Sequence, residues 1–273
     1  MRDLTEATIL VTGATDGLGK RVATDLAERG ATVLIHGRNP ERLEGAREEI
    51  RKETGSEKLG SYLADFSSLG QVCALAEHIL SERERLDVLV NNAGVIVGER
   101  RESEDGYELT FAVNYLAHFL LTGLLLPVLR DSAPARIVNV ASAGQSPIAF
   151  DDVMLERRFD GMRAYTQSKL AQVMFTFELA ERLQSDGVTA NALHPASLMD
   201  TKMVLETFGR TMSTVQEGAE ATVRLAVSPK LEGVTGRYFD GTREGRANAQ
   251  AYDREARKRL WALSEELCRK VEN

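Results

Sequence analysis

Cysteine is scarce in this chain of 273 residues, which contains only Cys73 and Cys268. The two lie far apart and form no Cys-x-x-Cys pair, so neither a disulfide framework nor a thiolate metal site is indicated. Such cysteine usage fits a reducing compartment, and we expect a cytoplasmic protein. No pair of histidines has metal-ligand spacing, so we expect no metal site. We interpret every histidine as a helix-surface or strand-end residue: His36, His78, His118 and His194.

Basic charge is also in short supply, because 34 Lys and Arg stand against 41 Asp and Glu, a net charge of −7. Without a basic cluster, we expect no nucleic-acid or anionic-membrane partner. Long apolar runs are missing as well. The longest, Phe119–Leu129, is far shorter than the about 20 residues of a membrane span and is interpreted as a buried helix. Residues 1–6 carry charges where a signal peptide needs apolar residues, so no such peptide is expected.

Short apolar, β-branched runs are abundant, and they alternate with segments of helical period. The predicted strands are residues 8–11, 31–35, 60–65, 87–90, 136–140, 188–193 and 236–240. The predicted helices are residues 20–29, 41–53, 69–84, 107–129 and 163–184. Strands that are apolar throughout and alternate with helices pair in parallel, with helices on both faces. The sequence therefore predicts one α/β domain over residues 1–273, a doubly wound parallel sheet that binds ligands at the carboxyl ends of its strands.

A glycine-rich turn follows the first predicted strand and precedes the first predicted helix. Glycine allows a sharp turn and close approach to a diphosphate, while the first N–H groups of the helix point at the anion. We predict a dinucleotide site formed by Gly13, Thr15, Asp16, Gly17, Leu18 and Gly19. The alternative is a turn whose glycines serve packing alone.

The second predicted strand ends where NAD-binding proteins usually place an acid that binds the adenosine ribose. Here Gly37 occupies that place and is followed by Arg38 and Asn39. A guanidinium can bind a 2′-phosphate, which an acid would repel. We therefore predict NADP(H) as the cofactor, with NAD(H) as the alternative. The competing interpretation of Arg38 is a solvated loop charge.

Tyr165 and Lys169 lie four residues apart in a predicted helix, so both side chains share one helix face. A cation about 5 Å from a phenol favours the phenolate by roughly 3 kcal/mol, about two pH units. Tyr165 is thus a candidate general acid or base for a carbonyl or alcohol oxygen. The alternative is an exposed helix face.

Two further polar residues stand at places that suit the same chemistry. Ser142 follows the fifth predicted strand and can bind a substrate oxygen, or it can serve as a cap or turn serine. Asn114 lies inside a predicted helix, where asparagine is unfavourable unless its amide has partners. The alternative for Asn114 is a surface position.

Taken in order, these motifs resemble the short-chain dehydrogenase/reductase family over nearly the whole chain. The resemblance implies a seven-stranded Rossmann sheet and a catalytic tetrad of Asn114, Ser142, Tyr165 and Lys169. It also implies cofactor contacts at Asp65 by the adenine, at Asn92 and Ala93 by the ribose, and at Lys169 by the nicotinamide ribose. Phe66 and Gly94 are further cofactor-binding candidates. In this family the asparagine holds a water that links the lysine to solvent.

Finer details resemble the retinol dehydrogenase-like branch, notably residues 105–109, 114–119, 168–171 and 260–264. Arg38 and Asn39 are similar to its NADP(H)-preferring members. Two features depart from the family. Pro195 is followed by Ala196 where a glycine is usual, and the carboxamide-binding threonine is shifted by one residue to Thr201.

These observations predict an oxidoreductase that moves a hydride between NADP(H) and a small, apolar carbonyl or alcohol substrate. The alternatives are an NADP(H)-binding sensor or scaffold without turnover, and an epimerase-like extended relative, for which the chain is too short. Substrate loops are expected near residues 145–162 and 196–212. Their apolar residues predict a pocket, lid packing or oligomer contacts: Met154, Leu155, Phe159, Leu198, Met199, Met203 and Phe208. Family resemblance further implies a homodimer or homotetramer formed through the helices that carry Asn114 and Tyr165.

Overall fold

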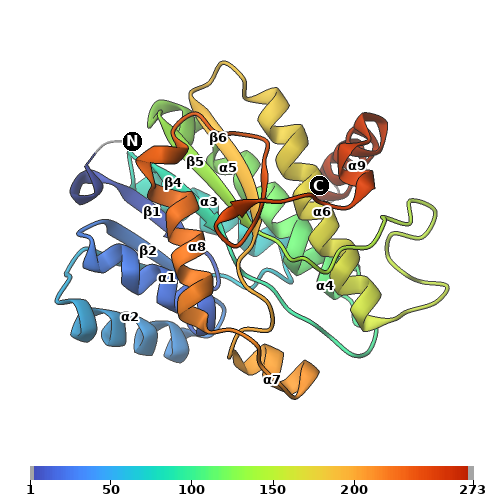
Figure 1. Ribbon diagram of the computed structural model, residues 1–273, viewed down its shortest axis with the longest axis horizontal. Helices are drawn as coiled ribbons and strands as arrows, with labels where there is room; N and C mark the ends of the chain where they lie inside the picture. Colours follow the sequence, from blue (N-terminus) through green and yellow to red (C-terminus); the bar gives the residue numbers. More distant parts are fainter. Residues whose placement is uncertain (1–2, 270–273) are drawn as a thin grey trace.

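One sheet organises the molecule in the computed structural model, which describes residues 3–269 (Figure 1). Its strands, in spatial order, are β3 (Leu59–Leu63), β2 (Thr32–Gly37), β1 (Thr8–Val11), β4 (Val88–Asn91), β5 (Ala135–Val140), β6 (Val188–His194), β7 (Tyr238–Asp240) and β8 (Arg243–Glu244). The seven predicted strands pair in parallel, and this prediction is confirmed. The eighth strand pairs antiparallel with β7. It was not predicted because its two exposed charged residues carry no β signal.

Helices cover both faces of the sheet, as a doubly wound fold requires. One layer holds α1 (Gly17–Glu28), α2 (Pro40–Thr54) and α8 (Val215–Val227). The opposite layer holds α3 (Leu69–Glu82), α5 (Ala117–Asp131) and α6 (Gly161–Arg182), with α9 (Arg254–Arg269) packed outside α6 (Figure 1). Two short helices, α4 (Leu109–Phe111) and α7 (Lys202–Phe208), complete the described fold.

Side chains alternate between the two faces along each strand, so the sheet contributes to a hydrophobic core on each face. Leu10 packs into the cluster under α5 and α6, while Ile9 and Val11 pack into the cluster under α1 and α8. All three side chains are fully buried. Because successive strand residues point to opposite faces, an entirely apolar strand is the form that a sheet covered on both faces requires.

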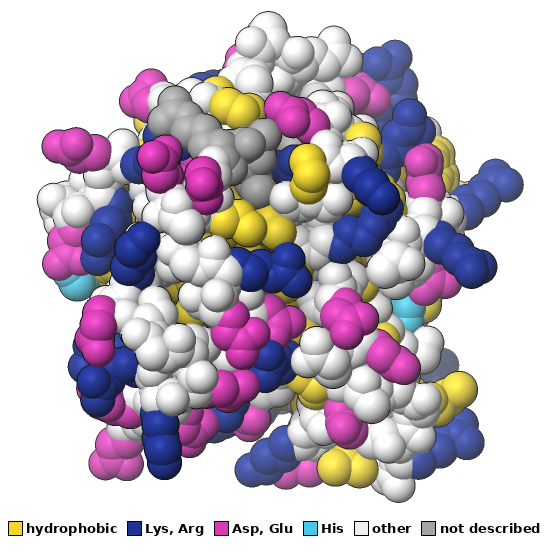
Figure 2. All heavy atoms as spheres, turned by 60° about the vertical axis from the view of Figure 1, so that its left-hand side comes forward, with side chains coloured by type: hydrophobic (Ala, Val, Ile, Leu, Met, Phe, Trp, Pro, Cys, Tyr) yellow, Lys and Arg dark blue, Asp and Glu magenta, His cyan; other side chains and the backbone are white. Residues whose placement is uncertain are grey.

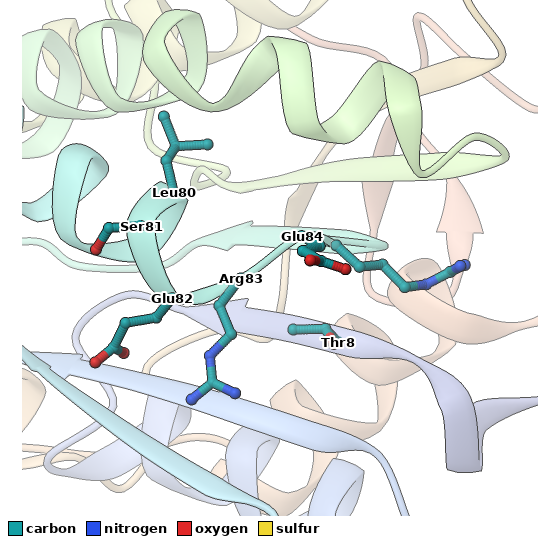
Figure 3. A pocket seen from close by; sticks show the side chains of 7 residues that line it. Thr8, Leu80, Ser81, Glu82, Arg83 and Glu84 are labelled. Atoms are coloured by element: carbon teal, nitrogen blue, oxygen red, sulfur yellow. The ribbon is translucent and has the colours of Figure 1, made fainter.

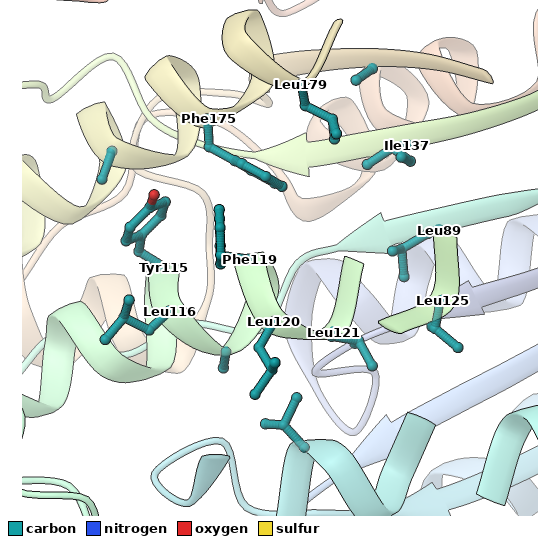
Figure 4. Close-up of a cluster of buried hydrophobic side chains, with 14 of the residues drawn as sticks. Leu89, Tyr115, Leu116, Phe119, Leu120, Leu121, Leu125, Ile137, Phe175 and Leu179 are labelled. Atoms are coloured by element: carbon teal, nitrogen blue, oxygen red, sulfur yellow. The ribbon is translucent and has the colours of Figure 1, made fainter. Parts of the chain in front are cut away.

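The helical stretch Leu109–Asp131 runs without interruption through α4, a π-helical segment (Ala112–Leu116) and α5. By length and composition it is apolar enough to cross a membrane, but 78% of the relevant window is buried inside the protein. Figure 4 shows its side chains, including Phe119 and Leu125, packed toward α6 and the sheet. The predicted buried helix at residues 119–129 is thereby confirmed.

Three helices in the last third of the chain were not predicted, namely α7, α8 and α9. Of these, α9 lies against α6, where Trp261 packs on the rings of Phe119 and Phe175 at centroid distances of 5.0 and 5.9 Å. The α5 and α6 surface expected to form oligomer contacts is therefore partly covered by the same chain. Figure 2 shows acidic and basic side chains interspersed over one face of the molecule.

Candidate active site

The candidate site lies at the carboxyl ends of β1, β4 and β5, where the strand order reverses between β1 and β4. This switch point is where open α/β sheets bind ligands. The structure brings the glycine turn, the asparagine loop after β4 and the predicted tetrad to this edge. An open hollow of about 370 Å³ lies elsewhere, beside Thr8 at the start of β1 (Figure 3). It is at the opposite edge of the sheet and holds none of the predicted site residues.

Close packing explains two of the glycines in the turn. A Cβ on Gly13 would lie 2.7 Å from the Ala93 Cα, and one on Gly19 would lie 2.3 Å from the Gly13 oxygen. The φ angles of Gly13 and Gly17 are +65° and +49°, which L side chains rarely adopt. The packing alternative thus accounts for the glycines themselves. The helix nevertheless starts inside the turn, at Gly17, whose N–H donates to the capping Asp16 carboxylate at 2.8 Å.

Asn92 fixes the turn to the neighbouring strand. Its Nδ2 donates to the main-chain oxygens of Thr12 and Gly13 at 2.8 and 3.2 Å. The Thr12 hydroxyl in turn accepts from the N–H groups of Asn92 and Ala93. The Asn92 side chain, predicted at the ribose, is thus engaged in holding the glycine turn.

At the end of β2, Thr15 crowds the place where an acid would stand. A Cβ on Gly37 would lie 2.3 Å from Thr15 Cγ2. Arg38 is exposed, and no ion pair engages it among residues 3–269. Asn39 caps α2 by accepting from Arg42 N at 2.9 Å. The Arg42 guanidinium lies 2.9 Å from the Asp16 carboxylate in the glycine turn, so the turn's negative charge has a basic partner.

Asp65 and Phe66, which follow β3, are buried to different extents. Asp65 is half-buried, and its Oδ1 accepts from Ser67 N at 2.9 Å. Phe66 is 3% exposed and stacks on His36 at 4.3 Å. The Phe66 side chain therefore packs beneath the edge and cannot itself line a cofactor surface.

Tyr165 and Lys169 lie on α6 as the spacing predicts, with Lys169 Nζ 5.7 Å from the centre of the tyrosine ring. Tyr165 is half-buried and hydrogen-bonds the Ser142 side chain, which stands two residues after β5. Lys169 is 5% exposed. An exposed helix face, the alternative for this pair, is therefore ruled out.

The predicted lowering of the phenol pKa is wrong for this structure. Burial raises the pKa of Tyr165, and the hydrogen bond with Ser142 only partly opposes this rise. Burial also lowers the pKa of Lys169 to about 7, so near neutral pH the lysine carries only part of a charge. Desolvation of both groups outweighs the attraction that the spacing alone predicted.

Asn114 is fully buried in the π-helical segment, so a surface position is excluded. Its Oδ1 accepts from Val95 N at 2.8 Å, and its Nδ2 donates to Val95 O and Ser168 Oγ, both at 3.0 Å. Single-turn π segments occur frequently at functional sites. The main-chain oxygen of Asn114 lies 3.0 Å from His118 Nδ1.

The nicotinamide end of the predicted site is built by the segment after β6. Pro195 is buried and Ala196 half-buried. Thr201 caps α7, since its hydroxyl accepts from Val204 N at 3.2 Å. A Cβ on Gly17 would lie 3.2 Å from Thr201 Cγ2, so Thr201 does lie beside the glycine turn.

The two predicted substrate loops differ in exposure. In residues 145–162, Leu155 is 1% exposed and Met154 packs against the core, so neither forms an open pocket wall. In residues 196–212, Met203 and Phe208 are 37% and 40% exposed. Met162 in the first loop is also 39% exposed, so both loops carry exposed apolar side chains and the second carries more of them.

The interpretation of His118 as a helix-surface residue is wrong, because it is 1% exposed. Its Nε2 lies 3.3 Å from Thr12 Oγ1, and its Nδ1 lies 3.2 Å from Gln172 Nε2. The sequence analysis assigned no functional role to His118 or Gln172. The available signal was the spacing of four between Asn114 and His118, which places them on one face of a buried helix.

Comparison with known proteins agrees with this geometry. The family model described as short chain dehydrogenase matches residues 7–210. Retinol dehydrogenase 13 of Mus musculus is 41% identical over 277 residues, which cover 95% of this chain and 83% of the relative. A solved uncharacterized protein from Mycobacterium paratuberculosis has a TM-score of 0.80 at 30% identity, covering 97% of this chain and 94% of its own. A short chain dehydrogenase from Shigella flexneri complexed with NADP has a TM-score of 0.73 at 28% identity, covering 88% and 99%. The chain therefore belongs to the short-chain dehydrogenase family of oxidoreductases and resembles its retinol dehydrogenase branch.

Proposed function

We propose that this protein transfers a hydride between NADP(H) and the carbonyl or alcohol carbon of a small, apolar substrate. The observation that carries the proposal is the buried Lys169 beside the Tyr165 ring, at the same sheet edge as the glycine turn. A lysine is costly to bury without a use for its charge. An NADP(H)-binding sensor could use Lys169 to bind the ribose, but it would have no use for the phenol of Tyr165.

The residues at the edge fit a dinucleotide, because the glycine turn and the start of α1 form an anion-binding geometry. The bound cofactor would supply or accept the hydride. Tyr165 would give a proton to the carbonyl oxygen, or take one from the alcohol, while Ser142 donates a hydrogen bond to the same oxygen. Lys169 would stabilise the phenolate that Tyr165 becomes. The negative phosphates of a bound dinucleotide would favour the charged form of this lysine.

The preference for NADP(H) rests on three observations at the ends of β1 and β2. Arg38 has no ion partner among the described residues and so is free to bind a 2′-phosphate. Gly37 stands where an acid would bind the ribose of NAD(H), and a side chain there would require Thr15 to turn away. The Asp16 carboxylate, which would repel a phosphate, is paired with Arg42. The NADP bound to the Shigella neighbour is in keeping with this preference.

An apolar substrate is supported by the exposed side chains of the loop over the site. Besides Met203 and Phe208, Leu205 and Met212 are 50% and 70% exposed. Relatives named retinol dehydrogenase make retinal-type aldehydes the first compounds to try. The cytoplasmic location, the small-molecule partner and assembly through the tetrad helices stay predictions.

The test is turnover of NADPH with a panel of carbonyl compounds that contains retinal, short aliphatic aldehydes and cyclic ketones. We expect NADPH oxidation with at least one apolar member, and its loss in the Lys169→Met variant. Tight NADPH binding without turnover across the panel would contradict the proposal and favour the sensor alternative.

A further inference from the structure

A row of four buried polar side chains connects Lys169 to the glycine turn, and the proposed function uses only the first of them. Lys169 Nζ donates to Gln172 Oε1 and to the Val140 main-chain oxygen, both at 2.8 Å. Gln172 Nε2 lies 3.2 Å from His118 Nδ1, and His118 Nε2 lies 3.3 Å from Thr12 Oγ1. All four side chains are 5% exposed or less, so their polar atoms take partners from within the row and from the main chain around it.

The lysine end of the row imposes one order of donors and acceptors. An ammonium only donates, so charged Lys169 requires the Gln172 oxygen to face it. The amide NH₂ then points at His118 and donates to Nδ1, which must carry a lone pair. In a neutral ring the proton is therefore on Nε2. Charged Lys169 thus selects one tautomer of His118.

The Thr12 end favours the other tautomer. Thr12 Oγ1 accepts from Asn92 N at 2.9 Å and from Ala93 N at 3.0 Å, which occupies both of its lone pairs. A proton on His118 Nε2 would meet no free lone pair there. With its proton on Nδ1 instead, the ring donates to the Asn114 oxygen at 3.0 Å, and the Thr12 hydroxyl proton has two acceptors at 3.3 Å, His118 Nε2 and the Val90 main-chain oxygen.

A turn of the Gln172 amide reconciles the two ends when Lys169 is neutral. A neutral amine can accept a hydrogen bond, so the amide NH₂ can face Lys169 while Oε1 accepts from His118 Nδ1. Burial lowers the pKa of Lys169 to about 7, which makes both arrangements accessible near neutral pH. His118 stays neutral throughout, because burial lowers its pKa to about 3.

Few ionisable groups surround this lysine. Among the described residues, the titratable side chains that face Lys169 are Tyr165 on α6 and His118 on α5. From β5 it meets the main-chain oxygen of Val140, and from the loop after β4 Gly94 lies beside it, since a Cβ there would lie 3.8 Å from Lys169 Nζ. The Gln172 oxygen is therefore a principal stabiliser of the ammonium.

We propose that Gln172 is a positioning residue for Lys169: its amide stabilises the ammonium and relays the charge of that lysine to His118 and Thr12. Protonation of the catalytic Lys169 would then change the hydrogen bonding at Thr12 in the glycine turn. Assigning Lys169 to catalysis rests on the proposed function, but the hydrogen-bond relay itself does not.

The first test follows the titration of Lys169 by NMR of the protein with isotope-labelled lysine, with its signal assigned by loss in Lys169→Met. We expect Gln172→Leu to lower the titration midpoint by about one pH unit, because one charge-assisted hydrogen bond is lost. Gln172→Glu should raise it by about one to three pH units, because a carboxylate replaces the amide. If the leucine variant does not fold, the glutamate variant decides alone.

Gln167 offers a matched control on the same helix. It is also 1% exposed, but its amide binds Ala149 N and Val153 O, away from Lys169. Gln167→Leu should leave the Lys169 midpoint unchanged. An unchanged midpoint in both Gln172 variants would overturn the proposal.

The second test reads the His118 tautomer from its ring ¹⁵N shifts across the same pH range. We expect the tautomer to change with the Lys169 titration in the natural protein and to stop following it in Gln172→Leu. A tautomer that ignores Lys169 in the natural protein would overturn the relay. Both readouts need no turnover, so absence of any carbonyl reduction would contradict the proposed function and leave this inference standing.

Discussion

Replacing Arg38 with alanine should separate the two nicotinamide cofactors. The guanidinium is exposed and has no ion partner in residues 3–269, so its removal should leave the free energy of unfolding within about 0.5 kcal/mol. A hydrogen bond to a charged group contributes about 1.5–3 kcal/mol, and the open position of Arg38 favours the lower part of that range. At about 1.4 kcal/mol per tenfold, kcat/KM with NADPH should fall roughly 10- to 30-fold.

The assay compares kcat/KM for NADPH and NADH at fixed substrate concentration and ionic strength. The value with NADH should stay within about twofold, since NADH carries no 2′-phosphate. Arg51→Ala is a matched control, because Arg51 is an exposed arginine at the far end of α2 that pairs with Glu48. Equal losses with both cofactors in Arg38→Ala would refute the assignment of Arg38 to the phosphate.

Three further changes test the fold of the site and the charge state of the lysine. Gly19→Ala should weaken NADPH binding at least about tenfold, because its Cβ would lie 2.3 Å from the Gly13 oxygen, whereas Gly45→Ala, with nothing within 4 Å, should leave binding unchanged. Calorimetric binding that is equal in the two variants would contradict this reading of the turn. Asn114→Ala should lower the free energy of unfolding by about 3 kcal/mol in urea titrations, because the Val95 N–H and the Val95 main-chain oxygen both lose their hydrogen bonds to the Asn114 amide. A loss below about 0.5 kcal/mol would contradict this expectation. The Lys169 pKa falls from 10.5 to about 7 on folding, so the unfolded chain binds more protons between those values, and the free energy of unfolding should rise with pH across that window. Lys169→Met should lack this rise, and a parallel profile for the two proteins would show that the lysine is not desolvated.

Helices and strands with a clear local sequence pattern could be predicted from the sequence. β1 and β4 are apolar except for Thr8 and Asn91 at their ends. The main displacement of α1 is at its start, because the helix begins within the glycine turn at Gly17 rather than at Lys20. The missed helix α8 carries a local signal, a capping box formed by Thr214 and Glu217. The eighth strand has no such signal and follows only from its pairing with β7.

The sequence predicted which residues meet at the site, but it did not predict how burial shifts their pKa values. Spacing placed Tyr165 and Lys169 together, but the direction of the phenol pKa depends on burial, which many distant segments create. The partners of Asn114 come from the loop after β4 and from α6, so its role inside a helix could be posed from the sequence but not resolved. The same holds for Gln172, whose hydrogen bonds join two helices that are far apart in the chain.

The most direct measurement of the central claim is turnover and NADPH binding by Tyr165→Phe, which removes one hydroxyl and keeps the ring over Lys169. Loss of the proton donor should lower kcat by at least about a hundredfold, the usual contribution of general acid catalysis, while the NADPH dissociation constant changes less than about threefold. Turnover within about threefold of the natural protein would contradict the role of Tyr165 as the acid and base of this site.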